Sequence, residues 1–328
     1  MDPSLYKTFK VSRGFTYRYY SSPPKDSQAR TILFLHGFPN ADTDWRHQVT
    51  FFKARGYGVV VPQMLGYGET SKPTDPAAYR QSLMSTDLAE ILDAEGINQV
   101  VVIGHDWGSF VAARFANFRP ERTIAVGFVT VGYLPPNPNF NLEASNKKTK
   151  EMLGFEVLGY WNFLTAPDAP KLCMDNFENF FNAVWADPVE HLDPAKADVS
   201  FRTVLESKVT IPPPRQLSEE RLMSEHLLKN GLEAPMTYYR AYASGIAPED
   251  DKLLEGKADI DKPVFFLDAL KDVIACEKHF SVAMGHDESP IAKHCKNATV
   301  KRVEVDHWVL FRIPHELNTM LLEWLGTF

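Results

Sequence analysis

The sequence has few cysteines, no basic stripe and no long apolar run, and each of these absences excludes a class of protein. Its 3 cysteines are odd in number and lack Cys-x-x-Cys spacing, which argues against a disulfide framework and against a zinc site. The net charge is -7 with acidic and basic residues mixed along the chain, so no nucleic-acid partner is expected. No apolar run reaches the roughly 18 residues of a transmembrane helix, so no membrane span is expected.

Targeting signals are also absent. The first residues, MDPSLYKTFK, lack an apolar signal core, and the last residues, LGTF, match neither a peroxisomal nor an ER address. The absence of these signals predicts a cytoplasmic protein located in the cytosol. The length of 328 residues and the 44% apolar composition are those of a globular protein with a substantial core, in one large domain or two ordinary ones.

Short Val/Ile-rich segments alternate with helical patterns over the first part of the chain. They show little polar alternation, which is typical of strands buried on both faces of a parallel sheet, and they are TILFLHG (31–37), GVVVP (58–62), QVVVIGH (99–105) and TIAVGFVTVG (123–132). Helices are predicted over 81–96 and 109–120, ending at Gly96 and Pro120. Repeated βα units predict the α/β class with a doubly wound, mostly parallel sheet.

The pattern changes after GYLPPNPNF (132–140), where the β-rich segments stop. The following region is aromatic, with helices predicted over 176–185 and 217–231 and a loop over 210–216. Strand signals resume later, and the last segments are strands over 263–272 and 299–308 and a helix over 315–326. We therefore expect a core of residues 1–134 and 246–328, interrupted by an inserted helical cap of residues 135–245.

The segment VVIGHDWGS (101–109) predicts a strand that runs into a sharp turn and then a helix. Gly104 and Gly108 stand two residues before and two after Asp106, and this frame lets the central side chain stand exposed at the carboxyl end of the strand. An ordinary turn with Asp106 as a helix cap is the alternative. Ser109 lies one residue outside the frame, so the candidate nucleophile is Asp106.

A carboxylate at this position has a chemical consequence. A serine that attacks a saturated carbon makes an ether, which resists cleavage, whereas an aspartate makes an ester, which water can hydrolyse. The carboxylate also needs no base, since its reference pKa of roughly 4 leaves it ionised at neutral pH. Asp106 thus predicts attack on an electrophilic saturated carbon, such as that of an epoxide or an alkyl halide.

Hydrolysis of such an ester needs a general base with an orienting acid, and in this fold both follow the nucleophile in the chain. The segment VDHW places His307 just past the last strand segment, although a lone histidine could also fill the surface or the core. The preceding strand segment ends LDALKD, which offers Asp268 or Asp272 as the acid. The sequence therefore predicts His307 as the base and one of these two aspartates as its partner.

The ester's oxyanion needs backbone N–H donors. One should be Trp107, directly after the nucleophile. The other should come from the loop His36–Gly37–Phe38–Pro39, unless that loop is only a turn that ends the strand. Pro39 has no N–H, so Phe38 is the expected donor.

Several dispersed motifs together resemble the soluble epoxide hydrolases of the α/β-hydrolase superfamily. They are LHGFP, GYGETSKP (66–73), GHDWGS, NPNF, YYR (238–240), LKD and DHW, and the resemblance runs in order from about residue 5 to the end. It implies the α/β-hydrolase fold with a helical cap (lid), a single hydrolase unit without the N-terminal phosphatase domain of some vertebrate members, and no metal or organic cofactor. The implied partners are a small apolar epoxide and water; xenobiotic, fatty-acid and terpenoid epoxides stay open, as does the oligomeric state.

The resemblance also assigns individual residues. Two cap tyrosines that hydrogen-bond the epoxide oxygen fall on Tyr160, in GYWNFLTAPDAP (159–170), and on Tyr239, in APMTYYRAY (234–242), with Tyr238 as a near competitor. The acid falls on Asp272, which leaves Asp268 structural. After Tyr160, where some relatives have a glutamine, this chain has Trp161, which we expect to shape the pocket. The substrate is expected to contact His36, Phe38, Trp107 and Trp161.

Related enzymes and a non-enzyme remain as alternatives. Haloalkane dehalogenases share the HDWG elbow but hold halide with the following Trp and often with the Asn of HGNP, where this chain has Phe38. Fluoroacetate dehalogenases have an Arg where Trp107 stands. A missing catalytic residue would favour a non-catalytic binding protein. The five expected catalytic residues are all present: Asp106, Asp272, His307, Tyr160 and Tyr239. The sequence therefore predicts an epoxide hydrolase that acts through a covalent ester on Asp106.

Overall fold

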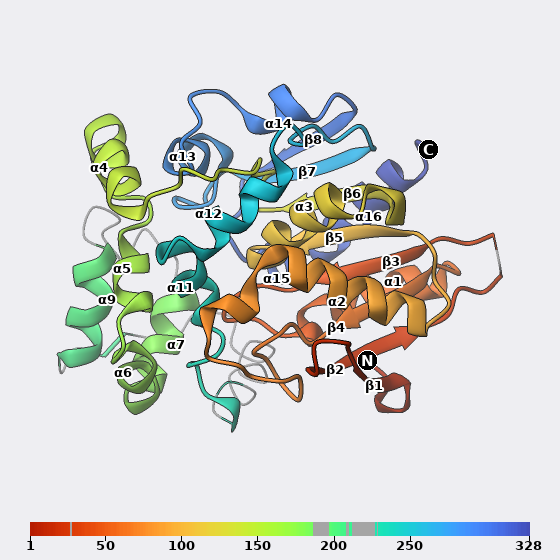
Figure 1. Ribbon diagram of the computed structural model, residues 1–328, viewed down its shortest axis with the longest axis horizontal. Helices are drawn as coiled ribbons and strands as arrows, with labels where there is room; N and C mark the ends of the chain where they lie inside the picture. Colours follow the sequence, from red (N-terminus) through yellow and green to blue (C-terminus); the bar gives the residue numbers. More distant parts are fainter. Residues whose placement is uncertain (27, 186–196, 208–209, 212–226, 228) are drawn as a thin grey trace.

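The computed structural model describes all residues except 27, 186–196, 208–209, 212–226 and 228, and an eight-stranded sheet runs through the described part (Figure 1). The strands lie in the order β1-β2-β4-β3-β5-β6-β7-β8. The strands from β3 to β8 pair in parallel, and β1 and β2 join antiparallel at one edge. The bounds are β1 Tyr6–Lys10, β2 Thr16–Ser22, β3 Thr31–Leu35, β4 Gly58–Pro62, β5 Val100–His105, β6 Thr123–Val129, β7 Val264–Ala269 and β8 Ala298–Val303.

The six parallel strands overlap the six segments that the sequence predicts, and the α/β class with a mostly parallel sheet is confirmed. Several expected strands are too long at their carboxyl ends. Gly37, Asp272 and His307 lie in loops beyond β3, β7 and β8 rather than in the strands themselves. These loops all leave the same edge of the parallel sheet, which is where sites form in open α/β sheets.

The N-terminal hairpin of β1 and β2 was not predicted. β1 (YKTFK) is only half-buried or exposed at every position, because it is the edge strand of the sheet. β2 (TYRYYSS) buries tyrosines and a serine rather than Val or Ile, and pairs its Tyr19 with Pro62 of β4. A search for Val/Ile-rich segments therefore misses both strands.

Helices cover both faces of the sheet. On one face α1 (Arg46–Ala54) and α16 (Pro314–Leu325) pack on side chains such as Phe34 and Ile103, and this core includes Trp45 and Trp324. On the other face α2 (Gln81–Ala94) and α3 (Trp107–Phe118) pack on residues such as Leu33 and Val102, and this second core continues into the helices described next. Alternate residues of each strand thus face different cores, as the doubly wound fold requires.

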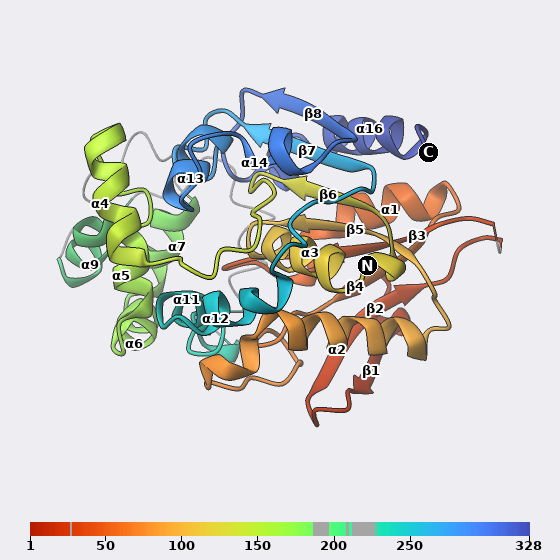
Figure 2. The same cartoon turned by 45° about the horizontal axis from the view of Figure 1, so that its top comes forward.

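A block of short helices lies beyond the carboxyl edge of the sheet, clearly to one side of it in Figure 2. Its helices are α4 Leu142–Leu153, α5 Gly159–Thr165, α6 Ala169–Asp175, α7 Phe177–Trp185, α9 Ala197–Glu206, α11 Thr237–Ala243 and α12 Ile246–Asp251. No strand occurs among the described residues between β6 and β7, and α5 packs on both α9 and α11. Most of the predicted helix 217–231 and loop 210–216 lies outside the described residues. The division at residues 134/135 and 245/246 stays a prediction.

The remaining helices are short, and three of them are α-helices that follow β7 and β8 in the chain. They are α13 Glu277–Ala283, α14 Pro290–His294 and α15 Val309–Arg312, with single-turn 3₁₀ helices η1 Pro3–Leu5, η2 Asp42–Trp45, η3 Pro76–Tyr79, η4 Pro120–Arg122 and η6 Lys252–Leu254. Of these, α13 packs against α4. None of the described helices is both long and apolar enough to cross a membrane.

A buried ion pair joins the two connections between the sheet and the helical block. Arg114 of α3 contacts Asp251 of α12 at 2.6 Å, and each side chain is 2% exposed. The guanidinium also donates to the Leu134 carbonyl, and the carboxylate accepts the Asn137 backbone N–H at 2.8 Å. One pair therefore holds both the outgoing segment around residue 135 and the returning helix α12.

Candidate active site

The turn between β5 and α3 holds Asp106 in a backbone conformation that few residues adopt. Asp106 has φ 53° and ψ -124°, in the region that costs a non-glycine residue conformational energy. A Cβ at Gly104 would overlap the Gly108 carbonyl, and a Cβ at Gly108 would overlap the Leu35 carbonyl oxygen. Both glycines of the frame are thus required for the close approach of backbone that makes the turn.

The Asp106 carboxylate faces the loop after β3. The Phe38 backbone N–H donates to Asp106 Oδ1 at 2.8 Å, and a Cβ at Gly37 would overlap the carboxylate. Burial raises the pKa of Asp106 above its ordinary value, although the nearby His307 charge and the backbone N–H groups of Phe38 and Trp107 oppose that rise. The two expected oxyanion donors therefore already point at the carboxylate.

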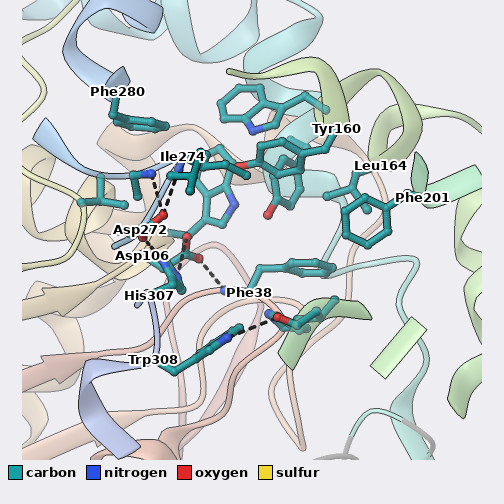
Figure 3. Close-up of a pocket in the computed structure, with 18 of the residues that line it drawn as sticks. Phe38, Asp106, Tyr160, Leu164, Phe201, Asp272, Ile274, Phe280, His307 and Trp308 are labelled. Carbon is teal, nitrogen blue, oxygen red and sulfur yellow. Dashed lines mark hydrogen bonds and ion pairs between the residues drawn. The ribbon is translucent and has the colours of Figure 1, made fainter. Parts of the chain in front are cut away.

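His307 lies between two carboxylates, as Figure 3 shows. Its Nδ1 is 2.6 Å from Asp272 Oδ2, and its Nε2 is 3.7 Å from Asp106 Oδ2. Burial alone would lower the pKa of His307, but the charges of Asp272 and Asp106 outweigh it and raise the pKa to about 9. The free site therefore holds a protonated imidazole between two carboxylates at neutral pH.

Asp272, and not Asp268, is the acid that contacts His307. Its Oδ1 accepts the backbone N–H groups of Ile274 at 3.1 Å and Ala275 at 2.8 Å. Burial opposes ionisation of Asp272, yet His307 and these donors hold its pKa below the ordinary value. Asp268 instead accepts the Glu277 backbone N–H at 3.0 Å, away from the histidine.

Two cap tyrosines face Asp106 from the helical block. Tyr160 of α5 and Tyr239 of α11 line the same cavity as the carboxylate, with ring centroids 6.1 Å apart. Burial is the main cause that raises the pKa of both phenols well above the ordinary value, and the charge of Asp106 adds to it, so both hydroxyls keep their protons. Tyr238 is absent from the described cavity wall and packs on Tyr79 with ring centroids 4.9 Å apart.

The cavity over Asp106 has a volume of about 160 Å³ and a wall dominated by aromatic and aliphatic side chains. Trp161 lies in that wall, together with Phe38, Phe110, Phe180, Phe201, Phe280, Ile274, Leu164 and Trp308. His36 does not line it: its Nε2 accepts the Met64 backbone N–H at 3.0 Å, behind the loop. The expected contact between His36 and the substrate is therefore corrected to a role in holding the loop.

Several residues of the site were not found from the sequence. His105 is fully buried beside His307, and its Nε2 contacts the His307 carbonyl at 3.1 Å. Its position next to Asp106, on a strand with alternating faces, was a usable signal. Asp306 also lines the cavity and pairs with Arg312 at 3.2 Å. Phe180 and Phe201 come from cap helices that are distant in the sequence. The sequence pattern of those helices does not distinguish a phenylalanine that lines the cavity from one that packs in the core.

The acidic, histidine and cysteine side chains are the groups that could hold a metal ion. In the part of the chain that the structure describes, no group of three or more His, Cys, Asp or Glu is placed to do so. The acidic groups at the cavity are instead engaged with His307, with backbone N–H groups or with Arg312.

Comparisons with known proteins give two consistent findings. A family model described as alpha/beta hydrolase fold matches residues 30–193, which is half of the chain. Curated relatives include bifunctional epoxide hydrolase 2 of Sus scrofa, 27% identical over 90% of this chain and 51% of that protein, and epoxide hydrolase srdG of Neurospora crassa, 26% identical over 97% of this chain and 94% of that protein. The chain spans about half the length of the Sus scrofa relative.

Solved structures show the same likeness of fold. Epoxide hydrolase A of Mycobacterium thermoresistibile superposes with a TM-score of 0.76 at 21% identity, and each chain is covered to 98%. Epoxide hydrolase VrEH1 of Vigna radiata gives a TM-score of 0.76 at 22% identity, also over 98% of each chain. The expected fold and the expected resemblance to the epoxide hydrolases are confirmed.

Proposed function

This chain belongs to the α/β-hydrolase fold family, and we propose that it is an epoxide hydrolase that converts a small apolar epoxide and water to a vicinal diol. The observation that carries this proposal is a carboxylate, Asp106, at the nucleophile position, opposed by two protonated cap phenols across an apolar cavity. A carboxylate suits attack on a saturated carbon, and an alkoxide leaving group needs a proton donor. The cytosolic location stays a prediction from the sequence.

In the first step Asp106 Oδ2 attacks one carbon of the epoxide. The carbon–oxygen bond breaks, and Tyr160 and Tyr239 stabilise and protonate the departing oxygen. Asp106 Oδ1 stays on the Phe38 N–H, at the 2.8 Å that separates them in the free protein. The product of this step is an ester between Asp106 and the opened substrate.

In the second step His307 activates water against the ester carbonyl. Esterification removes the Asp106 charge, so one cause of the raised His307 pKa is lost and the imidazole can release its proton. That proton replaces the one that the phenol gave. The neutral Nε2 then takes a proton from water, Asp272 holds the imidazole, and the N–H groups of Phe38 and Trp107 bind the oxyanion. The bond between the carbonyl carbon and the substrate oxygen then breaks, the added hydroxyl gives its proton to that oxygen, and the diol leaves the Asp106 carboxylate and the protonated imidazole behind.

The proposal is tested with a panel of aryl and alkyl epoxides and, in parallel, chloro- and bromoalkanes. We expect diol from the native protein and none from Asp106→Ala. Halide release without diol would make the protein a dehalogenase and the roles of the two tyrosines wrong. If neither diol nor halide forms from any substrate, a non-catalytic binding protein of this fold would be favoured.

A trapping experiment tests the covalent intermediate. His307→Gln removes the base but leaves the nucleophile and both tyrosines. We expect this variant to gain the full mass of one substrate molecule, measured on the intact protein. A His307→Gln variant that makes diol and never gains mass would exclude the two-step scheme.

A further inference from the structure

Trp161 lies at the cavity and has a buried indole N–H that makes no regular hydrogen bond within the described structure. The side chain is 1% exposed and lies in the cavity wall. Among the residues that the structure describes, its Nε1 has no hydrogen-bond partner. Indole N–H is a donor only, and a buried donor without an acceptor destabilises the fold that holds it. Such a group calls for a functional explanation when it lies at a reaction centre.

The neighbours of Trp161 are the groups that act on the epoxide oxygen. It follows Tyr160 on α5, and the two rings stand at 90° with centroids 6.4 Å apart. It also packs on Tyr239 at 5.4 Å and on Trp107 at 5.3 Å, measured between ring centroids. The indole is therefore fixed by aromatic contacts beside both phenols.

The charge on Tyr160 changes during ring opening. Burial, followed by the negative charge of Asp106, raises the pKa of Tyr160, and a hydrogen-bonding contact from the Trp161 indole N–H acts in the opposite sense and lowers it. When the phenol gives its proton to the epoxide oxygen, negative charge develops on the phenol oxygen. The Trp161 N–H makes no regular hydrogen bond in the resting protein, although it lies close enough to the phenol to lower its pKa, and it then gains a charged acceptor.

We propose that Trp161 is a positioning residue for ring opening: its indole N–H takes the Tyr160 oxygen as acceptor while that oxygen gives up its proton. The atoms balance, because the phenol proton moves to the substrate oxygen and the indole keeps its own. An interaction that strengthens as the charge develops favours the transition state over the bound substrate, and so raises the rate of ring opening rather than the affinity for substrate. This inference rests on the proposed epoxide hydrolase function.

The test compares Trp161→Gln with Trp161→Met, since the two new side chains are similar in length and only glutamine keeps an N–H donor. Trp161→Phe is the third variant, which retains a ring. Each is made in the His307→Gln protein, and growth of the substrate adduct is followed by rapid quenching and intact mass. We expect Trp161→Met and Trp161→Phe to slow adduct formation about tenfold or more, as loss of a hydrogen bond to a charged group does, while Trp161→Gln recovers part of the rate.

A double variant separates this role from packing. In a Tyr160→Phe protein there is no phenol oxygen to receive the N–H, so removing the donor at residue 161 should cost no further rate. The rate of ester hydrolysis, measured as decay of preformed adduct with His307 intact, should stay within about twofold, because the N–H acts on ring opening alone. Equal rates for the glutamine and methionine variants, or an undiminished loss when Tyr160→Phe is also present, would overturn the inference.

Failure of the inference is distinguishable from failure of the proposed function. A native protein that makes no diol from any epoxide removes the function and the inference with it. A native protein that makes diol, with Trp161→Met as fast as native in adduct formation, removes the inference alone.

Discussion

The negative charge of Asp106 adds to the larger effect of Asp272 in keeping His307 protonated. The two side chains are 3.7 Å apart, and Asp272 holds the other imidazole nitrogen at 2.6 Å. Both carboxylates favour the charged imidazole, whose pKa is about 9. In the proposed mechanism the base becomes available only after the nucleophile has reacted, since the ester no longer carries the charge. Early activation of water beside an unreacted nucleophile is thereby suppressed.

This coupling predicts a pKa change that needs no substrate. Asp106→Asn removes the charge as esterification does, so we expect the pKa of His307 to fall below about 9. NMR titration of the imidazole measures it, with Asp306→Asn as the control for a weaker neighbouring charge. In the ester intermediate the charge of Asp106 is also absent, so the pKa of His307 should be lowered there too. The rate of ester hydrolysis should therefore rise as the pH rises through that lowered pKa, because the neutral imidazole is the active form. A pKa that stays near 9 in Asp106→Asn would refute the coupling.

The two aspartates near the end of β7 provide a matched pair of variants. Asp272→Asn leaves the imidazole in place but without its charged partner, so we expect ester hydrolysis to slow by up to about 10⁴-fold. Asp268→Asn should change the rate of ester hydrolysis little, because Asp268 accepts the Glu277 N–H and does not contact His307. Single-turnover decay of the substrate adduct measures both, and equal losses would speak against the assignment of the acid.

At this scale the sequence predicted some residues from chemistry and others only from resemblance. Asp106 follows from the glycine frame, and His307 from its place after a strand. The choice of Asp272 over Asp268, and of Tyr239 over Tyr238, came from the family pattern. Neighbouring residues in a loop or on a helix point in different directions, and only the local backbone decides which one meets the cavity.

At the scale of elements, one buried ion pair joins the sheet to the helical block. Arg114 and Asp251 satisfy each other, and they also bind the backbone of the segment that leaves the sheet. Loss of either partner leaves the other charge buried without the ion pair that the structure shows. The connections therefore depend on this pair more than on any surface contact.

Arg114→Met should destabilise the protein strongly, by about 3–5 kcal/mol, because Asp251 stays buried without its partner. The control is Lys252→Met, which removes an exposed pair with Glu249 next to the same helix and should cost less than about 1 kcal/mol. Urea unfolding followed by circular dichroism gives both values. If the two variants lost equal stability, the buried pair would not hold the connections.

The elements themselves were predicted to different extents. The parallel strands and the helices α2 and α3 were expected, because Val/Ile-rich segments and helical periodicity mark them directly. β1 and β2 were missed, since an edge hairpin of tyrosine, lysine and threonine carries no such pattern. How the short cap helices pack depends on contacts between distant segments, which local patterns do not encode.

At the scale of the whole molecule, the cavity combines apolar walls with negative charge. Asp106, Asp272 and Asp306 line it, and no lysine or arginine is present in the described part of its wall. His307 supplies the only positive charge found in that described wall, and it lies between two of the carboxylates. A substrate with its own carboxylate would meet like charge in a medium that screens it poorly.

The cavity should therefore distinguish uncharged epoxides from acids. We expect the primary amide of an epoxy fatty acid to exceed the free acid in kcat/KM by at least about tenfold, since the two differ in charge and hardly in size. Asp306→Asn should narrow that ratio. The ratio is measured as diol formation from the two substrates in one competition experiment. A preference for the acid would contradict this prediction and would mean that a positively charged group outside the described wall reaches the substrate.

The hydrogen bond between the Phe38 N–H and Asp106 Oδ1 has a consequence for the origin of the atoms in the product. With Oδ1 held, the oxygen that attacks is Oδ2, and it leaves with the diol when water cleaves the ester at the carbonyl carbon. The protein thus gives away one of its own oxygen atoms at every turnover and takes a replacement from solvent. A single turnover in ¹⁸O water should yield unlabelled diol and a protein heavier by one label in the peptide that contains Asp106. Labelled diol in that first turnover would mean that water attacks the epoxide directly.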